Sequence, residues 1–155
     1  MNFLKGKINW GMLVSHHPPC QYDRTFSIGK RRFCVRCTSI FSGVLFTFLF
    51  FDQIVKINSL LFASCFILPL YAIINFTLNE LGLIKNNNLK RFISGLLLGF
   101  SLGFALNFIL NGNLIKGLLI IIWVFMLEFI VAIILNRHGK LENFFKEYEE
   151  GIFKN

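Results

Sequence analysis

The sequence is poor in charged residues, and this scarcity excludes a typical water-soluble domain. Only 15% of its 155 residues are charged and 55% are hydrophobic, whereas a soluble domain has about 25% charged and roughly 45–50% apolar residues. Internal repeats and low-complexity linkers are also lacking. Long runs of Leu, Ile and Phe are present instead, with twenty phenylalanines in all. We therefore expect a membrane protein.

Acidic residues are scarce as well, since 8 Asp and Glu stand against 16 Lys and Arg, giving a formal charge of +8. A basic excess can indicate nucleic-acid binding, but no basic helix or aromatic-basic sheet pattern accompanies it, so we expect no nucleic-acid partner. The N-terminal stretch 1–14 lacks the continuous apolar core of about 7–15 residues that a cleavable signal peptide needs. We expect nothing to be removed.

Four apolar runs are long enough to cross a hydrocarbon core about 30 Å thick at about 1.5 Å per residue. The predicted spans are 38–55, 59–79, 92–110 and 114–136. They predict an all-α fold, an integral four-helix bundle in a lipid bilayer. Residues 1–37 form an N-terminal segment with a Cys/His hairpin knuckle, and 137–155 form an amphipathic tail.

The basic residues predict how the helices are oriented. Fourteen of the sixteen Lys and Arg lie before the first run, between the second and third, or after the fourth; only Lys56 and Lys116 lie in the other two connections. Cytoplasmic loops carry the excess of Lys and Arg in membrane proteins. The pattern predicts a multi-pass protein of the inner cell membrane with both termini in the cytosol.

The third run carries Gly95, Gly99 and Gly103 at four-residue spacing. Such a groove lets another helix approach closely, where dispersion and weak hydrogen bonds replace the hydrophobic driving force that lipid removes. We interpret it mainly as an intramolecular packing face, with a homo-oligomer contact as the alternative.

The stretch 15–38 concentrates two of the three histidines and three of the four cysteines. His17 and Cys20 form an H-x-x-C pair, Cys34 and Cys37 form a C-x-x-C pair, and thirteen residues separate the pairs. Two such pairs at this distance predict a tetrahedral zinc site, or as second choice an iron site. His16 is the spare candidate for the histidine ligand.

A short hairpin would bring these pairs together. Gly29 and Lys30 resemble a two-residue turn between strands at 25–28 and 31–33. Residue 25 would then face residue 34 and residue 22 would face residue 37, which leaves Cys20 near the C-x-x-C pair. In the reducing cytosol, paired cysteines more often bind metal or do redox work than form a structural disulfide. A redox dithiol and unligated thiols are the alternatives.

The arginines of this segment have two interpretations. They could anchor the cytosolic side of the membrane, or they could lower thiol pKa values or hold a phosphate or carboxylate. We favour anchors, except for Arg24 and Arg36, which lie beside proposed metal ligands.

Glu128 lies within the fourth run. Placing a carboxylate in the bilayer core has a high free-energy cost, so such a residue is by default a candidate for a functional role. The structural alternative is a carboxyl group hydrogen-bonded to a neighbouring helix. Polar residues of the inner half of the first two spans could join Glu128 in a pocket that opens toward the knuckle. They are Thr38, Ser39, Ser42, Asn75 and Asn79.

Short motifs connect the chain to a known family. They are His16, Arg24-Thr25-Phe26, Gly29 and Cys34-Val35-Arg36-Cys37-Thr38. In these, and through 75–83 and 88–99, the sequence resembles the small prokaryotic membrane proteins of domain of unknown function 2085, over roughly residues 15–103. Relatives often have C-H-Q around the first histidine, where this chain has Ser15 and His17. If relatives use that cysteine as a ligand, His17 or Cys20 must replace it here. The resemblance implies a membrane protein and no particular reaction.

Three functions fit these observations. The first is a membrane protein whose zinc-type knuckle closes the bundle and serves structure or partner docking. The second is an inner-leaflet enzyme that uses a thiolate or metal-bound water, with Glu128 or Arg24 assisting. A thiol oxidoreductase resembling the vitamin K epoxide reductases is one form of it, although their usual extracytoplasmic C-x-x-C disagrees with the charge pattern. The third is a small transporter subunit that uses Glu128.

Overall fold

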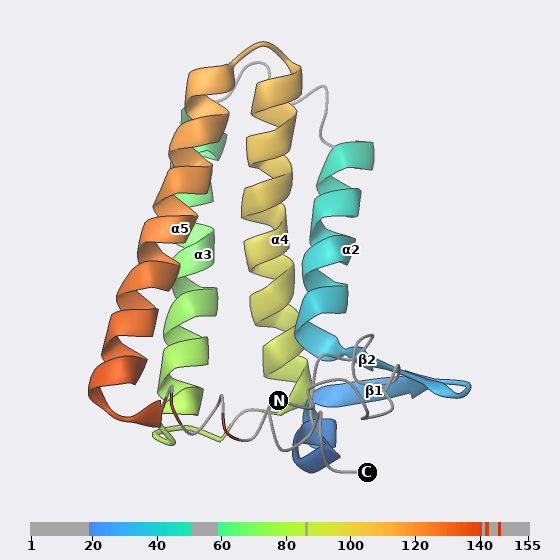
Figure 1. The fold of residues 1–155 in the computed structure, drawn as a ribbon. Coiled ribbons are helices and arrows are strands. Elements are labelled where there is room, and N and C mark those ends of the chain that lie inside the picture. Colours follow the sequence, from blue (N-terminus) through green and yellow to red (C-terminus); the bar gives the residue numbers. More distant parts are fainter. Residues whose placement is uncertain (1–18, 51–58, 86, 141, 143–145, 147–155) are drawn as a thin grey trace, which may run out of the picture.

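The computed structural model describes residues 19–50, 59–85, 87–140, 142 and 146. Four helices run side by side, and a short hairpin with a 3-10 turn lies at one end of them (Figure 1). We call this end the hairpin end and the opposite one the far end. The elements are η1 (Pro19–Arg24), β1 (Thr25–Ile28), β2 (Arg31–Cys34), α2 (Val35–Phe50), α3 (Ser59–Glu80), α4 (Asn88–Leu110) and α5 (Leu114–Arg137).

The structure confirms the predicted all-α bundle. Helices α3, α4 and α5 are each long and apolar enough to cross a membrane. Helix α2 has 16 residues and begins at Val35, three residues before the predicted span. The rest of that span, residues 51–55, lies outside the described residues.

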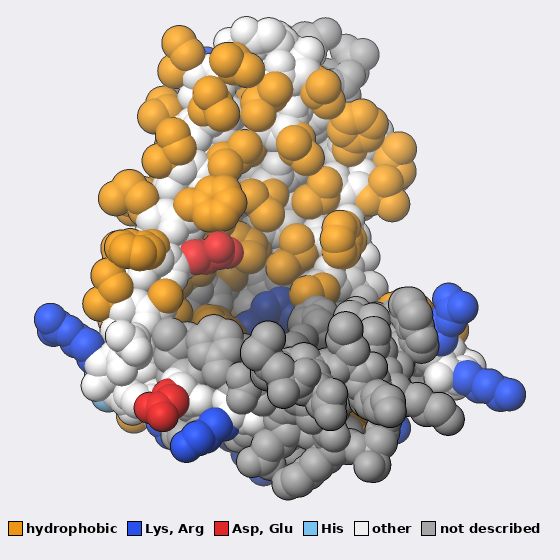
Figure 2. Space-filling view, viewed as in Figure 1, with side chains coloured by type: hydrophobic (Ala, Val, Ile, Leu, Met, Phe, Trp, Pro, Cys, Tyr) orange, Lys and Arg blue, Asp and Glu red, His pale blue; other side chains and the backbone are white. Residues whose placement is uncertain are grey.

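Burial in this fold is inverted relative to a soluble protein. Large apolar side chains face outward, among them Phe41 (74% exposed) and Leu60 (75%), whereas the small polar residues Ser39, Ser94 and Ser101 are fully buried. Figure 2 shows hydrophobic side chains covering the helices on one face. An outer surface of this kind suits hydrocarbon rather than water.

Helix α4 lies at the centre and packs against each of the other three helices. Its three spaced glycines face α2: a Cβ on Gly99 would overlap the Ile40 carbonyl, and one on Gly95 would lie 2.7 Å from the Arg36 carbonyl oxygen. From the other side, a Cβ on Gly43 of α2 would lie 2.7 Å from the Leu96 carbonyl oxygen. The groove is therefore filled by α2 of the same chain. Self-association through these glycines would require α2 to leave.

A proline in α3 leaves one backbone carbonyl without its usual hydrogen bond within the helix, and a side chain of α4 donates to it instead. Pro69 has no N–H to donate to the Cys65 carbonyl four residues earlier, and Ser101 of α4 donates its hydroxyl to that carbonyl at 2.7 Å. One residue on, the Phe66 carbonyl accepts a hydrogen bond from Trp123 Nε1 of α5 at 3.1 Å. Because hydrocarbon offers no donors, these two bonds lower the cost of the proline and join α3 to both neighbours.

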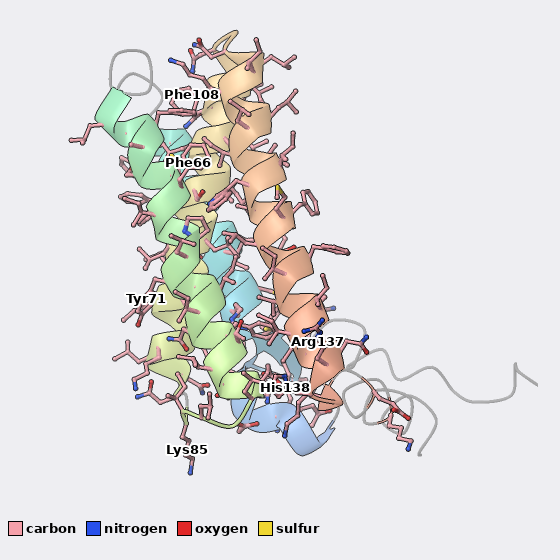
Figure 3. All side chains as sticks on the ribbon, turned by 90° about the vertical axis from the view of Figure 1, so that its left-hand side faces the viewer. Phe66, Tyr71, Lys85, Phe108, Arg137 and His138 are labelled. Carbon is pink, nitrogen blue, oxygen red and sulfur yellow. The ribbon has the colours of Figure 1, made fainter. Side chains whose placement is uncertain are left out.

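The apolar core lies where α3, α4 and α5 meet. Phe104, Phe108 and Ile120 are buried together, and Phe62 meets Phe108 edge to face at 5.7 Å between ring centroids. Figure 3 shows Phe66 and Phe108 in the part of the bundle away from Lys85, Arg137 and His138, which lie at the hairpin end. Packing and charge thus occupy different ends of the molecule.

Candidate functional site

The hairpin forms with the predicted turn and register. Strands β1 and β2 are antiparallel with Thr25 opposite Cys34, and Gly29 in the turn has φ +59°. The register does not continue to residue 37 as predicted, because β2 ends at Cys34 and Cys37 lies in the first turn of α2. The cysteine pair therefore sits at a strand-to-helix junction rather than along a strand.

Cys34 and Cys37 lie close together at this junction. Cys34 is buried and Cys37 is partly buried. Their side chains are hydrogen-bonded, and this bond, followed by burial, raises the pKa of Cys37. The Cys37 thiol therefore favours its protonated form.

The other predicted metal ligands are not placed by the structure. His16 and His17 lie outside the described residues, and Cys20 belongs to η1 with a side chain that is not described. Across the described ranges, no group of three or more His, Cys, Asp or Glu is placed to hold a metal ion. Two of the five predicted ligands, Cys34 and Cys37, are thus brought together, and the zinc or iron site stays a prediction.

Two ion pairs attach η1 to the bundle. Arg24 Nη1 lies 2.8 Å from Glu80 Oε1 at the end of α3. Arg91 Nη1 lies 3.4 Å from Asp23 Oδ2, and the Arg91 side chain is only 9% exposed. Sequence reasoning missed both pairs, although Arg91 continues the glycine line of α4. The position of the basic Arg91 on a close-packed helix face could have indicated that it has an acidic partner.

A cavity of about 330 Å³ opens beside the cysteine pair, and all four helices line it. Its polar residues are Arg36 from α2, Ser94 from α4 and Glu128 from α5. Figure 2 shows a hollow in this face, with an acidic side chain at its edge and a basic one deeper inside. Glu128 thus borders a cavity, as predicted, but none of the five other polar residues expected there lines it.

Serine and threonine hydroxyls explain part of this difference. Thr38 and Ser42 each donate to the carbonyl four residues earlier, and Ser39 donates to the Arg36 carbonyl. These bonds are made within α2 or to Cys34 directly before it, as is common for hydroxyls in apolar helices. Arg36, which lies in the same turn as Ser39, provides the cavity's positive charge instead.

A second cavity of about 190 Å³ adjoins the first. The two share Phe76, Glu128 and Val131, and the second extends between α3 and α5 to Glu80 and Lys140. Glu128 also borders a hollow on the outer face of α5, together with Phe125 and Phe129. The carboxyl group therefore stands between the interior cavities and the surface that faces lipid.

A family model described as predicted membrane protein, DUF2085, matches residues 20–105, which is more than half of the chain. The chain belongs to the DUF2085 family. The match includes the C-x-R-C segment, the glycine groove, α2, α3 and most of α4, close to the range of about 15–103 expected from the motifs. It ends before α5, so Glu128 lies outside it, as do His16 and His17. No curated protein and no solved structure matches this DUF2085 chain.

Proposed function

We propose that this DUF2085 protein is a multi-pass protein of the inner cell membrane whose N-terminal segment forms a cytosolic zinc-type Cys/His site. The site would hold the hairpin and the N-terminal segment against the bundle, and serve structure or docking of a partner. The main support for this metal site is that the turn from β2 into α2 brings the Cys34 and Cys37 side chains into hydrogen-bonding contact. Two sulfur ligands are therefore close before any metal binds.

The charge distribution supports the orientation. Of the Lys and Arg in the described part of the chain, only Lys116 belongs to the far end, in the first turn of α5. The rest belong to η1, the hairpin, the first turns of α2 and α4, the α3–α4 connection, or the end of α5 and the residues that follow it. Because Lys and Arg accumulate on the cytoplasmic side, the hairpin end faces the cytosol and both termini lie there. Labelling of introduced cysteines in intact cells would contradict this if the tail reacted from outside.

The position of η1 supports Cys20 as the third ligand. The Thr25 hydroxyl donates to the Tyr22 carbonyl at 2.8 Å, which ties η1 to the start of β1. Thr25 itself pairs with Cys34. The turn that carries Cys20 is thus joined to the strand that pairs with Cys34, which supports Cys20 as a ligand, and either His16 or His17 would complete a set of four. Strands of four residues cannot bury a core of their own, so a metal would contribute much of their stability.

Metal analysis of the purified chain tests this proposal. We expect about one zinc per chain in the wild type, lost in Cys34→Ser and Cys37→Ser because tetrahedral sites need all their thiolates. Cys65→Ala is the matched control, since Cys65 is buried in α3 away from the hairpin. His16→Ala and His17→Ala should differ, and only the true ligand should release metal.

The contrary result is equally clear. Metal-free protein with an unchanged melting temperature and freely titrating thiols at Cys34 and Cys37 would refute the zinc site. A redox dithiol would then be the better interpretation.

One observation favours a second candidate, an inner-leaflet enzyme or small transporter. Arg36 belongs to the C-x-R-C segment and also lines the cavity that contains Glu128. A metal with three protein ligands and one water would suit catalysis, whereas four protein ligands suit structure. X-ray absorption spectroscopy of the metal would separate these cases by the number of coordinated sulfur and oxygen atoms.

A further inference from the structure

The Arg36 guanidinium lies in the wall of the 330 Å³ cavity that all four helices line. It lies 4.7 Å above the ring centroid of Phe76. Within the described part of the chain it forms no ion pair and donates no hydrogen bond to a carboxylate. Burying a charged group without a partner is costly, so a cavity that presents such a group is suited to an anion.

The neighbouring carboxylates are already engaged. Glu80 is paired with Arg24 at 2.8 Å, and Asp23 with Arg91 at 3.4 Å. Arg36 is attracted by Cys34 and, less strongly, by Glu80, and it is repelled by both other arginines. Three arginines thus share two carboxylates, and the surplus charge of the group is carried by the one that faces the cavity.

The other walls of the cavity are apolar. Ile40, Ile73 and Leu98 line it, and Val131 lines both this cavity and the adjoining one between α3 and α5. Glu128 connects these spaces with the outer face of α5. A ligand that fits this cavity has an anionic headgroup and an apolar body, and it can enter from the bilayer.

From these features we infer that the cavity binds the headgroup of an anionic phospholipid from the inner leaflet. Arg36 donates charge-assisted hydrogen bonds to the lipid phosphate, for which the planar guanidinium fork is well matched. The acyl chains lie on the apolar walls. Glu128 on the opposite wall accepts a hydrogen bond from a headgroup hydroxyl, as phosphatidylglycerol provides. This inference does not depend on the metal site.

The test uses the full-length chain, stripped of lipid in detergent and titrated with phosphatidylglycerol, with complexes counted by native mass spectrometry. We expect one tightly bound lipid, bound about tenfold or more weakly by Arg36→Gln, since hydrogen bonds to charged groups contribute that much. Arg31→Gln is the matched control, because it removes the same charge from an exposed position on the hairpin. Its affinity should stay within about twofold of the wild type, since the phosphate is held by short-range hydrogen bonds.

A second variant keeps the test informative if Arg36→Gln does not fold. Ile73→Trp fills the cavity without changing charge, so it should block phosphatidylglycerol and leave zinc content unaltered. Equal phosphatidylglycerol affinity in wild type, Arg36→Gln and Ile73→Trp would overturn the inference.

Inorganic phosphate separates the two sources of the anion. It should fail to compete with phosphatidylglycerol at equal concentration, because it makes no use of the apolar walls. Equal competition would overturn the lipid assignment and identify the site as one for free phosphate. If the wild-type protein contained no metal but still bound phosphatidylglycerol, this result would count against the zinc proposal alone.

Discussion

At the far end of the bundle α3, α4 and α5 meet through aromatic and aliphatic side chains, whereas at the hairpin end ion pairs attach η1 to α3 and α4. Phe62 and Phe108 pack edge to face at the far end, below the single described charge there, Lys116. At the hairpin end Arg24, Arg91 and their carboxylate partners connect η1 to α3 and α4.

This contrast separates stability from function. The aromatic and aliphatic contacts at the far end hold the helices together by dispersion. At the hairpin end the described residues form two ion pairs, and two adjoining cavities lie between the helices, as is typical of sites that bind a ligand. The α2–α4 groove runs between the ends, and the predictions below test each part in turn.

The largest expected effect comes from the groove that both ends share. Gly99→Leu places a side chain where the Ile40 carbonyl lies, so α2 must separate from α4. Overpacking costs about 1–3 kcal/mol when neighbours can shift, and here the obstacle is backbone. We expect loss of monodisperse protein in detergent, measured by size-exclusion chromatography.

Ser42→Leu is the control for this change. Ser42 is exposed on α2 and bonds only its own helix, so leucine there should be tolerated. Equal yields and melting temperatures for the two variants would show that close contact between α2 and α4 does not hold the bundle together.

The groove, the spans and the hairpin turn could be predicted because each leaves a local signal. Glycines at spacing four, apolar runs of helical length and a Gly-Lys turn are visible without tertiary structure. The pairing of Thr25 with Cys34 follows from the turn alone. Most of the fold could therefore be predicted from local sequence patterns.

The ion pairs and the cavity wall could not be predicted in the same way. Arg24 and Glu80 are 56 residues apart, and their contact depends on how α3 returns to the hairpin end. Arg36 faces the cavity because Ser39 and Gly95 bring α2 close to α4, which fixes the rotation of α2. Helix rotation is a tertiary property, and spacing along one helix does not determine it.

A smaller effect is expected from the hydrogen bond that satisfies the Cys65 carbonyl. Ser101→Ala should destabilise the protein by about 1 kcal/mol, within the range measured for hydrogen bonds between membrane helices. In Pro69→Ala the restored N–H can serve the same carbonyl, so Ser101→Ala should cost less in that background. A double-mutant cycle on melting temperature measures the coupling, and purely additive effects would show that Ser101 does not act through Pro69.

The smallest effect concerns the charge balance at the hairpin end. Glu80→Gln and Arg24→Gln break the same 2.8 Å ion pair, and a partly exposed pair contributes only about 0.2–1 kcal/mol. The two variants differ in the charges that remain at the hairpin end. Glu80→Gln leaves three arginines with one carboxylate, whereas Arg24→Gln leaves two arginines with two carboxylates. We therefore expect Glu80→Gln to lower the melting temperature more. Because the difference is electrostatic, it should shrink in high salt, and added phosphatidylglycerol should reduce it as well if the lipid phosphate binds at Arg36. If both variants melted at the same temperature in low salt, surplus positive charge at the hairpin end would have no energetic consequence, and the contrast between the two ends would rest on packing alone.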